Sequence, residues 1–189
     1  MRTIRIALAL LLLAAPGWSA SGDVLAVFNA QNNEPPAKIY ATLRAVVGTS
    51  TPVENFLVLD FDDTTVEYAD FAGFMPAYYA GGGVTITFVW SAAATTNNGA
   101  WAAAFRDIPD DAEDLDTTAF TYDYNTTADL TPPSVVGETA EDTLAFTSGA
   151  DMDSVAASHF FRLRVKRPAP SGTPVAGDCS IHFVILRET

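Results

Sequence analysis

Cysteine and histidine are scarce in this chain of 189 residues, which contains Cys179, His159 and His182 and no others. A single cysteine excludes a disulfide within the chain, and so few sulfur and imidazole ligands exclude a typical zinc site. Cys179 lies in an alternating apolar run, which predicts a small buried side chain rather than a nucleophile. The sequence also lacks a G-x-S-x-G stretch and a glycine-rich loop before a helix. We therefore expect a protein that is not an enzyme.

Positive charge is also scarce. The chain has 10 Lys and Arg residues against 23 Asp and Glu residues, which gives a formal net charge of −13. Such a field repels phosphate groups and anionic membranes, so we expect no nucleic-acid role. The acidity is typical of a protein from a salty habitat, where screening weakens repulsion among carboxylates, or simply of a secreted protein with a low pI.

Long apolar runs are missing except near the N-terminus. Arg2 and Arg5 precede an unbroken apolar run over residues 6–15, and small residues follow it. The run is shorter than the roughly 20 residues that span a membrane. The pattern predicts a secretory signal peptide over residues 1–19, with a buried strand or a membrane anchor as alternatives. We expect a secreted or extracellular surface protein that does not insert into a membrane after cleavage.

Residues 84–105 carry the sharpest strand pattern. Two segments each place apolar side chains at alternate positions, and a polar link through Asn97, Asn98 and Gly99 separates them. Side chains of a strand alternate between its two faces, so the pattern predicts an antiparallel hairpin with an aromatic inner face. The inward residues are Val84, Ile86, Phe88 and Trp90 on the first strand and Trp101, Ala103 and Phe105 on the second.

Other strand candidates recur between turn residues, and helical periodicity is nearly absent. This spacing predicts an all-β protein, a single antiparallel β-sandwich of jelly-roll type with about eight to ten strands. We expect N-terminal strands or an arm over residues 20–54 and the sandwich domain over residues 55–189. The further strand candidates are residues 23–29, 39–47, 56–61, 65–71, 120–124, 143–146, 160–166 and 179–187.

The last strand candidate is apolar on one face and partly apolar on the other, which predicts a strand that is central or covered by a neighbour. Its alternation places Cys179, Ile181, Phe183 and Ile185 on one face and Ser180, His182, Val184 and Leu186 on the other.

Acidic clusters in three segments suggest calcium, because carboxylates in loops supply the oxygen ligands that calcium prefers. None of them matches the twelve-residue calcium loop pattern, so solvated acidic loops are the alternative. We expect no other cofactor. The candidate ligands are Asp60, Asp62, Asp63, Asp110, Asp111, Glu113, Asp114, Asp151 and Asp153.

Tyrosines offer a stacking platform for a sugar. Trp90 and Trp101 lie at the same alternate positions as Phe88 and Phe105, on the side of each strand expected to face the core, so we expect them to be buried. The better surface candidates for a glycan site are Tyr78, Tyr79, Tyr122 and Tyr124.

Basic residues gather near the C-terminus. Arg162, Arg164 and Lys166 share one face of a strand, opposite Phe161, Leu163 and Val165, and Arg187 lies in the last strand. The strip is either a solvated guard against edge pairing or a surface that meets an acidic loop of a neighbouring copy.

Several segments resemble a group of small β-sandwich proteins associated with structural gene cassettes of tailed bacteriophages, prophages and environmental sequences. The resemblance lies in residues 59–71, 75–85 and 149–154, the strand around Trp90, and residues 161–165 with 185–189. It covers most of residues 55–189 in order. The resemblance implies a non-enzymatic particle or fibre component that self-associates, and it brings no catalytic residue. The group lacks an export segment, so residues 1–19 favour an extracellular surface or filament protein, and a virion protein if they are not a true signal.

Our first hypothesis is therefore a structural subunit that acts by self-assembly into a homo-oligomer or polymer. The alternative is an extracellular glycan-binding module that binds a surface glycan.

Overall fold

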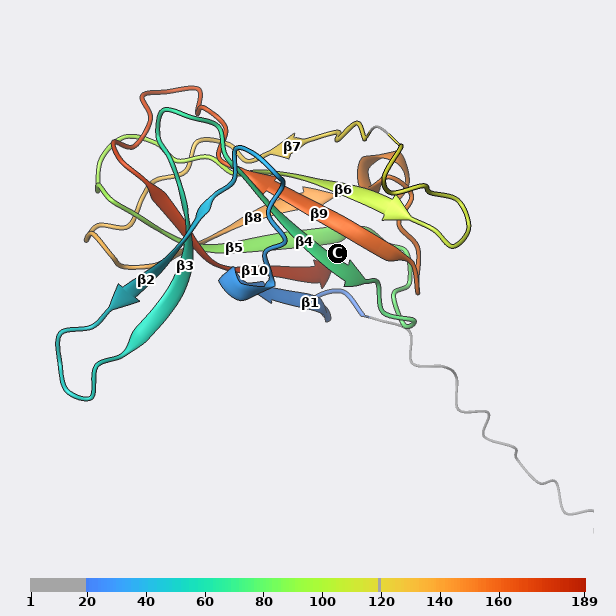
Figure 1. Ribbon diagram of the computed structural model, residues 1–189, viewed down its shortest axis with the longest axis horizontal. Helices are drawn as coiled ribbons and strands as arrows, with labels where there is room; N and C mark the ends of the chain where they lie inside the picture. The colour runs from blue at the N-terminus through green and yellow to red at the C-terminus, as the bar shows by residue number, and fades with distance from the viewer. Residues whose placement is uncertain (1–19, 119) are drawn as a thin grey trace, which may run out of the picture.

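The computed structural model describes residues 20–118 and 120–189 (Figure 1). The predicted signal peptide, residues 1–19, lies outside this range. The described residues form ten strands and two 3-10 turns, with no α-helix among them. The strands are β1 (Val24–Asn29), β2 (Thr42–Val47), β3 (Asn55–Phe61), β4 (Tyr68–Phe74), β5 (Val84–Ala92), β6 (Ala102–Ile108), β7 (Asn125–Thr126), β8 (Ala140–Phe146), β9 (Phe160–Lys166) and β10 (Cys179–Glu188).

The strands form two antiparallel sheets that pack face to face. Sheet A has the order β2-β3-β10-β5-β8, and β1 also pairs with β10. Sheet B has the order β4-β9-β6-β7. From β3 to β10 the chain passes back and forth between the sheets in the manner of a jelly roll, which confirms the predicted fold class. Residues 20–54 contribute β1 and β2 to sheet A.

The predicted hairpin over residues 84–105 is wrong. β5 pairs with β10 and β8 in sheet A, whereas β6 pairs with β9 and β7 in sheet B. The link between β5 and β6 crosses from one sheet to the other, and Gly99 and Leu130 exchange backbone hydrogen bonds of 2.8 and 2.9 Å there. Alternation reports which face of a strand is buried and is silent about the partner strand. The inward residues of both strands are nevertheless those predicted.

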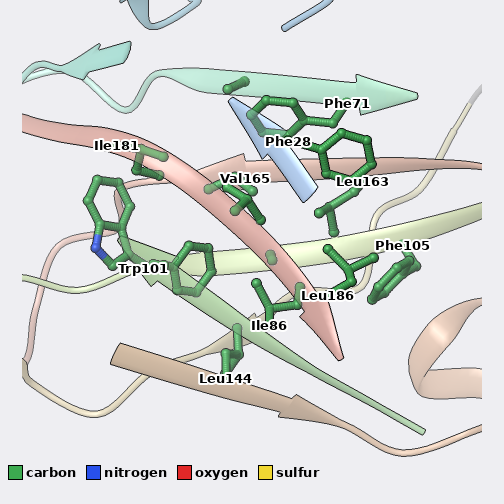
Figure 2. Packing of buried hydrophobic residues seen from close by; sticks show 14 of the residues in the cluster. Phe28, Phe71, Ile86, Trp101, Phe105, Leu144, Leu163, Val165, Ile181 and Leu186 are labelled. Atoms are coloured by element: carbon green, nitrogen blue, oxygen red, sulfur yellow. The ribbon is translucent and has the colours of Figure 1, made fainter. Parts of the chain in front are cut away.

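The core lies between the sheets and is rich in aromatic rings. Trp101 lies 5.1 Å from Phe61, 6.0 Å from Phe88 and 6.0 Å from Trp90, measured between ring centroids, and all four side chains are fully buried. Figure 2 shows side chains of both sheets meeting in this core. Each fully buried large apolar side chain contributes about 1.5–3 kcal/mol, so this cluster dominates the stability of the fold.

β10 is central, as predicted, because it pairs with β3 and β1 along one edge and β5 along the other. Its face assignment was half wrong. The register with β5 shifts between Ile181 and Phe183, so a β-bulge reverses the alternation beyond that point. Val184 and Leu186 are fully buried, and Phe183 is turned outward with 43% of its surface exposed. The bulge therefore brings Phe183 to the outer face of sheet A.

Residues 120–124 do not form the predicted strand, and only Asn125–Thr126 joins sheet B as β7. The alternating aromatics of this segment instead lie over basic side chains of sheet B. Tyr122 packs over Arg164 and Tyr124 packs over Lys166. The pattern in the sequence thus reports contact with the outer face of a sheet rather than a place in its hydrogen-bonded ladder.

Candidate functional site

The outer face of sheet A is hollowed. Three adjoining hollows of about 410, 420 and 230 Å³ share His182, and together we call them the sheet A groove. The β2–β3 hairpin, which extends from the body of the sandwich in Figure 1, contributes residues to all three. The residues of the groove used below are Arg44, Val46, Phe56, Asp60, Val89, Ser91, Asp178, Ser180, His182 and Phe183.

Strand register sets a row of polar side chains across the floor of the groove. Ser180 of β10 is the partner of Asp60 in β3 and of Ser91 in β5. Each of the three alternates with buried apolar neighbours, so the packing of the core forces it outward. The fold thereby gathers on one face three polar residues that are far apart in the sequence.

Arg44 and Asp60 form the most polar part of the floor. Arg44 Nη2 donates to Asp60 Oδ1 at 3.0 Å and to Ser180 Oγ at 3.2 Å, and Arg44 Nε also donates to Asp60 Oδ2. Ser180 Oγ donates to Asp60 Oδ1 at 2.5 Å. The hydrogen bond to Asp60 raises the pKa of Arg44. The Arg44 side chain remains 48% exposed, so a fixed guanidinium faces the groove with donors to spare.

Ser91 and His182 form a second polar pair, with 2.9 Å between Ser91 Oγ and His182 Nε2. Burial lowers the pKa of His182, the nearby charge of Arg44 lowers it further, and Asp60 acts in the opposite direction. The imidazole is therefore neutral at neutral pH. In residues 20–118 and 120–189 no carboxylate is bonded to His182, and Asp60 is bonded to Arg44 and Ser180 instead. The pair thus lacks the acidic member of a Ser-His-Asp triad.

Two phenylalanine rings lie beside the polar floor. Phe56 is 56% exposed and Phe183 is 43% exposed, and Val46 and Val89 line the same part of the groove. Exposed rings next to a few fixed polar groups suit a ligand that has both apolar C–H faces and hydroxyl groups.

Asp178 adds negative charge to the groove. Burial raises the pKa of Asp178, and the carboxylates of Asp60, Asp62 and Asp63 raise it further. Because Arg44 is already bonded to Asp60, the groove offers no unbalanced positive charge to an anionic ligand.

The predicted tyrosine platform is not assembled. Tyr79 is 5% exposed, contrary to its prediction as a surface residue, because its hydroxyl accepts a hydrogen bond from Gly83 N at 3.2 Å inside the fold. Tyr78 is exposed and donates to Val24 O. Tyr122 and Tyr124 lie 6.1 Å apart with their rings over Arg164 and Lys166. Burial raises the pKa of Tyr122 and of Tyr124.

The predicted basic strip shares the outer face of sheet B, where its two arginines, Arg162 and Arg164, are paired with carboxylates of the same chain. Arg164 donates to both oxygens of the fully buried Asp70, each at 2.6 Å, and Arg162 Nε lies 3.2 Å from the same carboxylate. Arg162 Nη2 also donates to Glu34 O at 2.7 Å. Arg187, on β10, donates to Gly22 O at 3.3 Å. These bonds leave little free positive charge for an acidic loop of another copy.

Three of the nine acidic candidates for calcium accept hydrogen bonds in turns and loops. Asp62 accepts from the backbone and hydroxyl of Thr64 at 2.7 and 2.6 Å, and the hydroxyl bond is the main reason why the pKa of Asp62 is lowered. Asp63 accepts from Gly177 N at 2.7 Å. Asp151 accepts from Thr147 N at 2.6 Å.

The remaining acidic candidates are dispersed. Asp153 accepts from Asp107 N at 2.9 Å, and Glu113 lies 3.6 Å from Arg106. Asp110, Asp111 and Asp114 are exposed in a loop. Among the residues that the structure describes, no three histidine, cysteine or acidic side chains gather where they could hold a metal ion.

Sequence reasoning missed most of the groove. Asp60 was considered only for calcium. Ser180, His182 and Phe183 were considered only for the faces of the last strand, and Arg44, Phe56 and Ser91 were not singled out. Ser91 could have been noticed in the sequence, because it is a polar residue among the apolar residues of β5. The outward turn of Phe183 was not readable, because it depends on the bulge.

No described helix has the length and apolar character needed to cross a membrane.

No protein-family model matches the chain, and no curated protein matches it. Among solved structures, the chain is similar to the C-terminal CBM6 of the laminarinase LamC from Zobellia galactanivorans, at 11% identity and a TM-score of 0.38, over 87% of this chain and 99% of that chain. It is similar to the CBM22-1 xylan-binding domain of Xyn10C from Paenibacillus barcinonensis, at 9% identity and a TM-score of 0.40, over 89% and 96% of the two chains. It is also similar to TmCBM61, solved with β-1,4-galactotriose, at 10% identity and a TM-score of 0.34, over 78% and 88%. Similarity at this level does not establish a function. The functional proposal therefore rests on the groove itself.

Proposed function

We propose that the protein is a non-catalytic, extracellular glycan-binding module whose sheet A groove binds a neutral sugar. One observation carries the proposal: the aligned row of Asp60, Ser180 and Ser91 forms the floor of a groove that also holds the half-exposed Arg44, and two exposed phenylalanine rings lie beside this floor. The proposal moves the glycan site from the tyrosines to the outer face of sheet A.

The polar groups of the floor match the chemistry of sugar hydroxyls, which both donate and accept hydrogen bonds. Arg44 supplies donors, Asp60 supplies acceptor oxygens, and the neutral His182 has a second ring nitrogen to offer. Arg44 is already held by Asp60 and Ser180 before a ligand arrives, so binding orders few side chains. The exposed rings of Phe56 and Phe183 supply apolar contact for the C–H faces of the sugar.

The charge of the chain argues for a neutral sugar rather than an acidic one. The net charge is −13, and Asp60 and Asp178 lie in the groove. A uronic acid or a sulfated sugar would approach against this field, because the single cation of the floor, Arg44, is already paired.

A glycan array followed by isothermal titration tests the proposal. We expect neutral oligosaccharides to bind and Phe56→Ala to weaken them, because the ring contact is lost. Phe74→Ala is the matched control, since Phe74 is also exposed but lies on β4 of sheet B. A blank array, or equal loss in both variants, would reject the groove as the site.

A chelator provides a further check on the floor of the groove. Arg44 and Asp60 bond to each other directly, so we expect EDTA to leave glycan binding unchanged. Loss of binding on chelation would instead support the calcium hypothesis and the loop carboxylates.

A second candidate function is a self-associating structural subunit, as part of a phage-like particle or an extracellular filament. One observation favours it: β2 is an edge strand of sheet A with exposed apolar side chains at Leu43 and Val47. Size-exclusion chromatography and negative-stain microscopy test it. Large regular particles are expected, and a monomer at high concentration would count against this function.

A further inference from the structure

The outer edge of β2 is open. Within residues 20–118 and 120–189, β2 pairs with β3 alone. Gly48 N donates to Glu54 O at 2.8 Å, and the register continues through the pairs of Val46 with Phe56 and Arg44 with Val58. Hydrogen-bonded pairs alternate in an antiparallel ladder, so the N–H groups of Thr42, Arg44 and Val46 point to β3. Those of Leu43, Ala45 and Val47 therefore point outward along the free edge.

This edge lacks the usual protection against strand pairing. Natural edges carry lysine, proline, a bulge or a charge turned inward. The register of β2 is continuous, and its single charged residue, Arg44, is turned to Asp60 on the groove side. Leu43 and Val47 are 54% and 59% exposed on the opposite face. By contrast, the free edge of β4 is covered by bridges from Asn33 and Tyr40.

Charge favours a second copy of this chain as the partner. The chain has a net charge of −13, so copies repel each other over most of their surfaces. The hairpin of β2 and β3 is an exception, because residues 42–58 carry one cation, Arg44, and one anion, Glu54. Two copies therefore meet with little repulsion at this hairpin.

We propose that two copies pair antiparallel through β2, about a two-fold axis at Ala45. In this register Ala45 lies opposite Ala45 of the second copy, and Leu43 lies opposite its Val47. The outward N–H and C=O groups of all these residues then face each other, as an antiparallel ladder requires. Centring the axis on Arg44 would instead set two like charges opposite each other. The same patch is used on both copies, so the contact closes as a dimer and does not propagate into a filament.

The dimer joins two sheets into one, and this has a consequence for ligand binding that rests on the proposed glycan function. A two-fold axis perpendicular to the sheet keeps both outer faces on the same side. Arg44 then lies opposite Val46 of the second copy, so the two grooves adjoin at the dimer axis. A polymeric glycan can engage both grooves, and such linkage raises apparent affinity by about 10²–10⁴-fold over a single site.

Light scattering coupled to size-exclusion chromatography, over a concentration series, tests the dimer. We expect the wild-type chain to approach twice the mass of one copy. Ala45→Pro should give a monomer, because it removes an outward N–H without touching the β2–β3 ladder. Ala45→Thr, which keeps the N–H, should remain a dimer. Because proline can also strain the strand, the double variant Leu43→Lys with Val47→Lys is a second route to the monomer.

Variants with one added cysteine test the register. Opposed residues at the axis lie within disulfide range, so Ala45→Cys should cross-link under mild oxidation. Arg44→Cys and Val46→Cys should cross-link far less, because neither lies opposite itself. Cys179 is buried and present in every variant, so it provides the background.

Three results would overturn the proposal. They are a wild-type monomer at all concentrations, open polymers, or strongest cross-linking at Arg44→Cys or Val46→Cys. The two proposals fail separately. A monomeric Ala45→Pro that binds a short oligosaccharide with wild-type affinity and loses only the avidity for a polymeric glycan would support both the dimer and the glycan-binding groove. Absence of any glycan binding by a confirmed dimer would reject the groove and leave the β2 contact standing.

Discussion

The two outer faces of the sandwich use the same pair of residue types in different ways. On sheet B, Asp70 is fully buried between Arg162 and Arg164, and Tyr122 packs over Arg164 at 4.2 Å. On sheet A, Asp60 is bonded to Arg44, whose side chain is 48% exposed, against 23% for Arg164. An arginine–aspartate pair under a cover is a structural element. The same pair on an open groove is available to a ligand.

The largest effect should come from Asp70→Asn. The change leaves Arg162 and Arg164 without their shared carboxylate, so we expect a loss of about 3 kcal/mol in the free energy of unfolding, measured by urea denaturation. Both arginines are partly exposed, which keeps the loss near the lower end for a buried pair.

Asp60→Asn is the matched variant on the open face. Arg44 can turn to water, so its loss of stability should be clearly smaller, about 1 kcal/mol. If Asp60→Asn costs more stability than Asp70→Asn, the contrast between a covered and an open face fails.

The next effect concerns ligand binding on the two faces. Phe56→Ala should lower the affinity for a neutral oligosaccharide about tenfold in isothermal titration, because it removes an exposed ring from the groove. Tyr122→Ala should leave this affinity unchanged, because the Tyr122 ring lies on sheet B. A loss of binding confined to Tyr122→Ala would return the site to the tyrosines.

The Tyr122 ring should instead contribute to stability. Tyr122→Leu removes a cation–π contact with Arg164 and keeps apolar cover, so we expect a loss of about 0.5–1 kcal/mol in thermal unfolding. No loss at all would show that residues 120–124 do not cover sheet B in solution.

The smallest effect should be the pH dependence due to His182. Its pKa in the folded chain is lowered from the ordinary 6.5 by burial, so the folded state binds fewer protons than the unfolded state below that pH. This contribution to stability is present above pH 6.5 and is lost as the pH falls through the folded pKa.

His182→Asn should therefore flatten the fall in thermal stability between about pH 7 and about pH 5.5, by less than about 1 kcal/mol. Asp178 acts in the opposite direction at lower pH, because its pKa is raised. An unchanged pH profile would mean that His182 is as well solvated in the folded chain as in the unfolded one.

Local alternation was enough to predict the sandwich. Val84, Ile86, Phe88 and Trp90 point inward as predicted, as do Phe161, Leu163 and Val165. The alternation of apolar residues along a strand shows which side chains are buried, and burial of apolar surface is the main source of stability in the core. For that reason the fold class could be read although the pairing of β5 with β10 and β8 could not.

The groove was out of reach for two physical reasons. The row of Asp60, Ser180 and Ser91 depends on strand neighbours that are distant in sequence. The outward position of Phe183 depends on a bulge in β10, which a strict alternation reverses. The platform predicted at Tyr122 and Tyr124 is not assembled for a related reason. These alternating aromatic residues cover Arg164 and Lys166 on sheet B, and this contact also depends on residues distant in sequence.

Titration of the isotopically labelled chain with a neutral oligosaccharide, followed by amide and side-chain NMR shifts, tests the central claim most directly. The open face of sheet A predicts shifts that gather at Arg44, Phe56, Ser91, Ser180 and His182, with Tyr122 and Arg164 unmoved. Shifts that gather instead on sheet B around Tyr122 and Arg164, or no shift with any neutral sugar, would contradict the account.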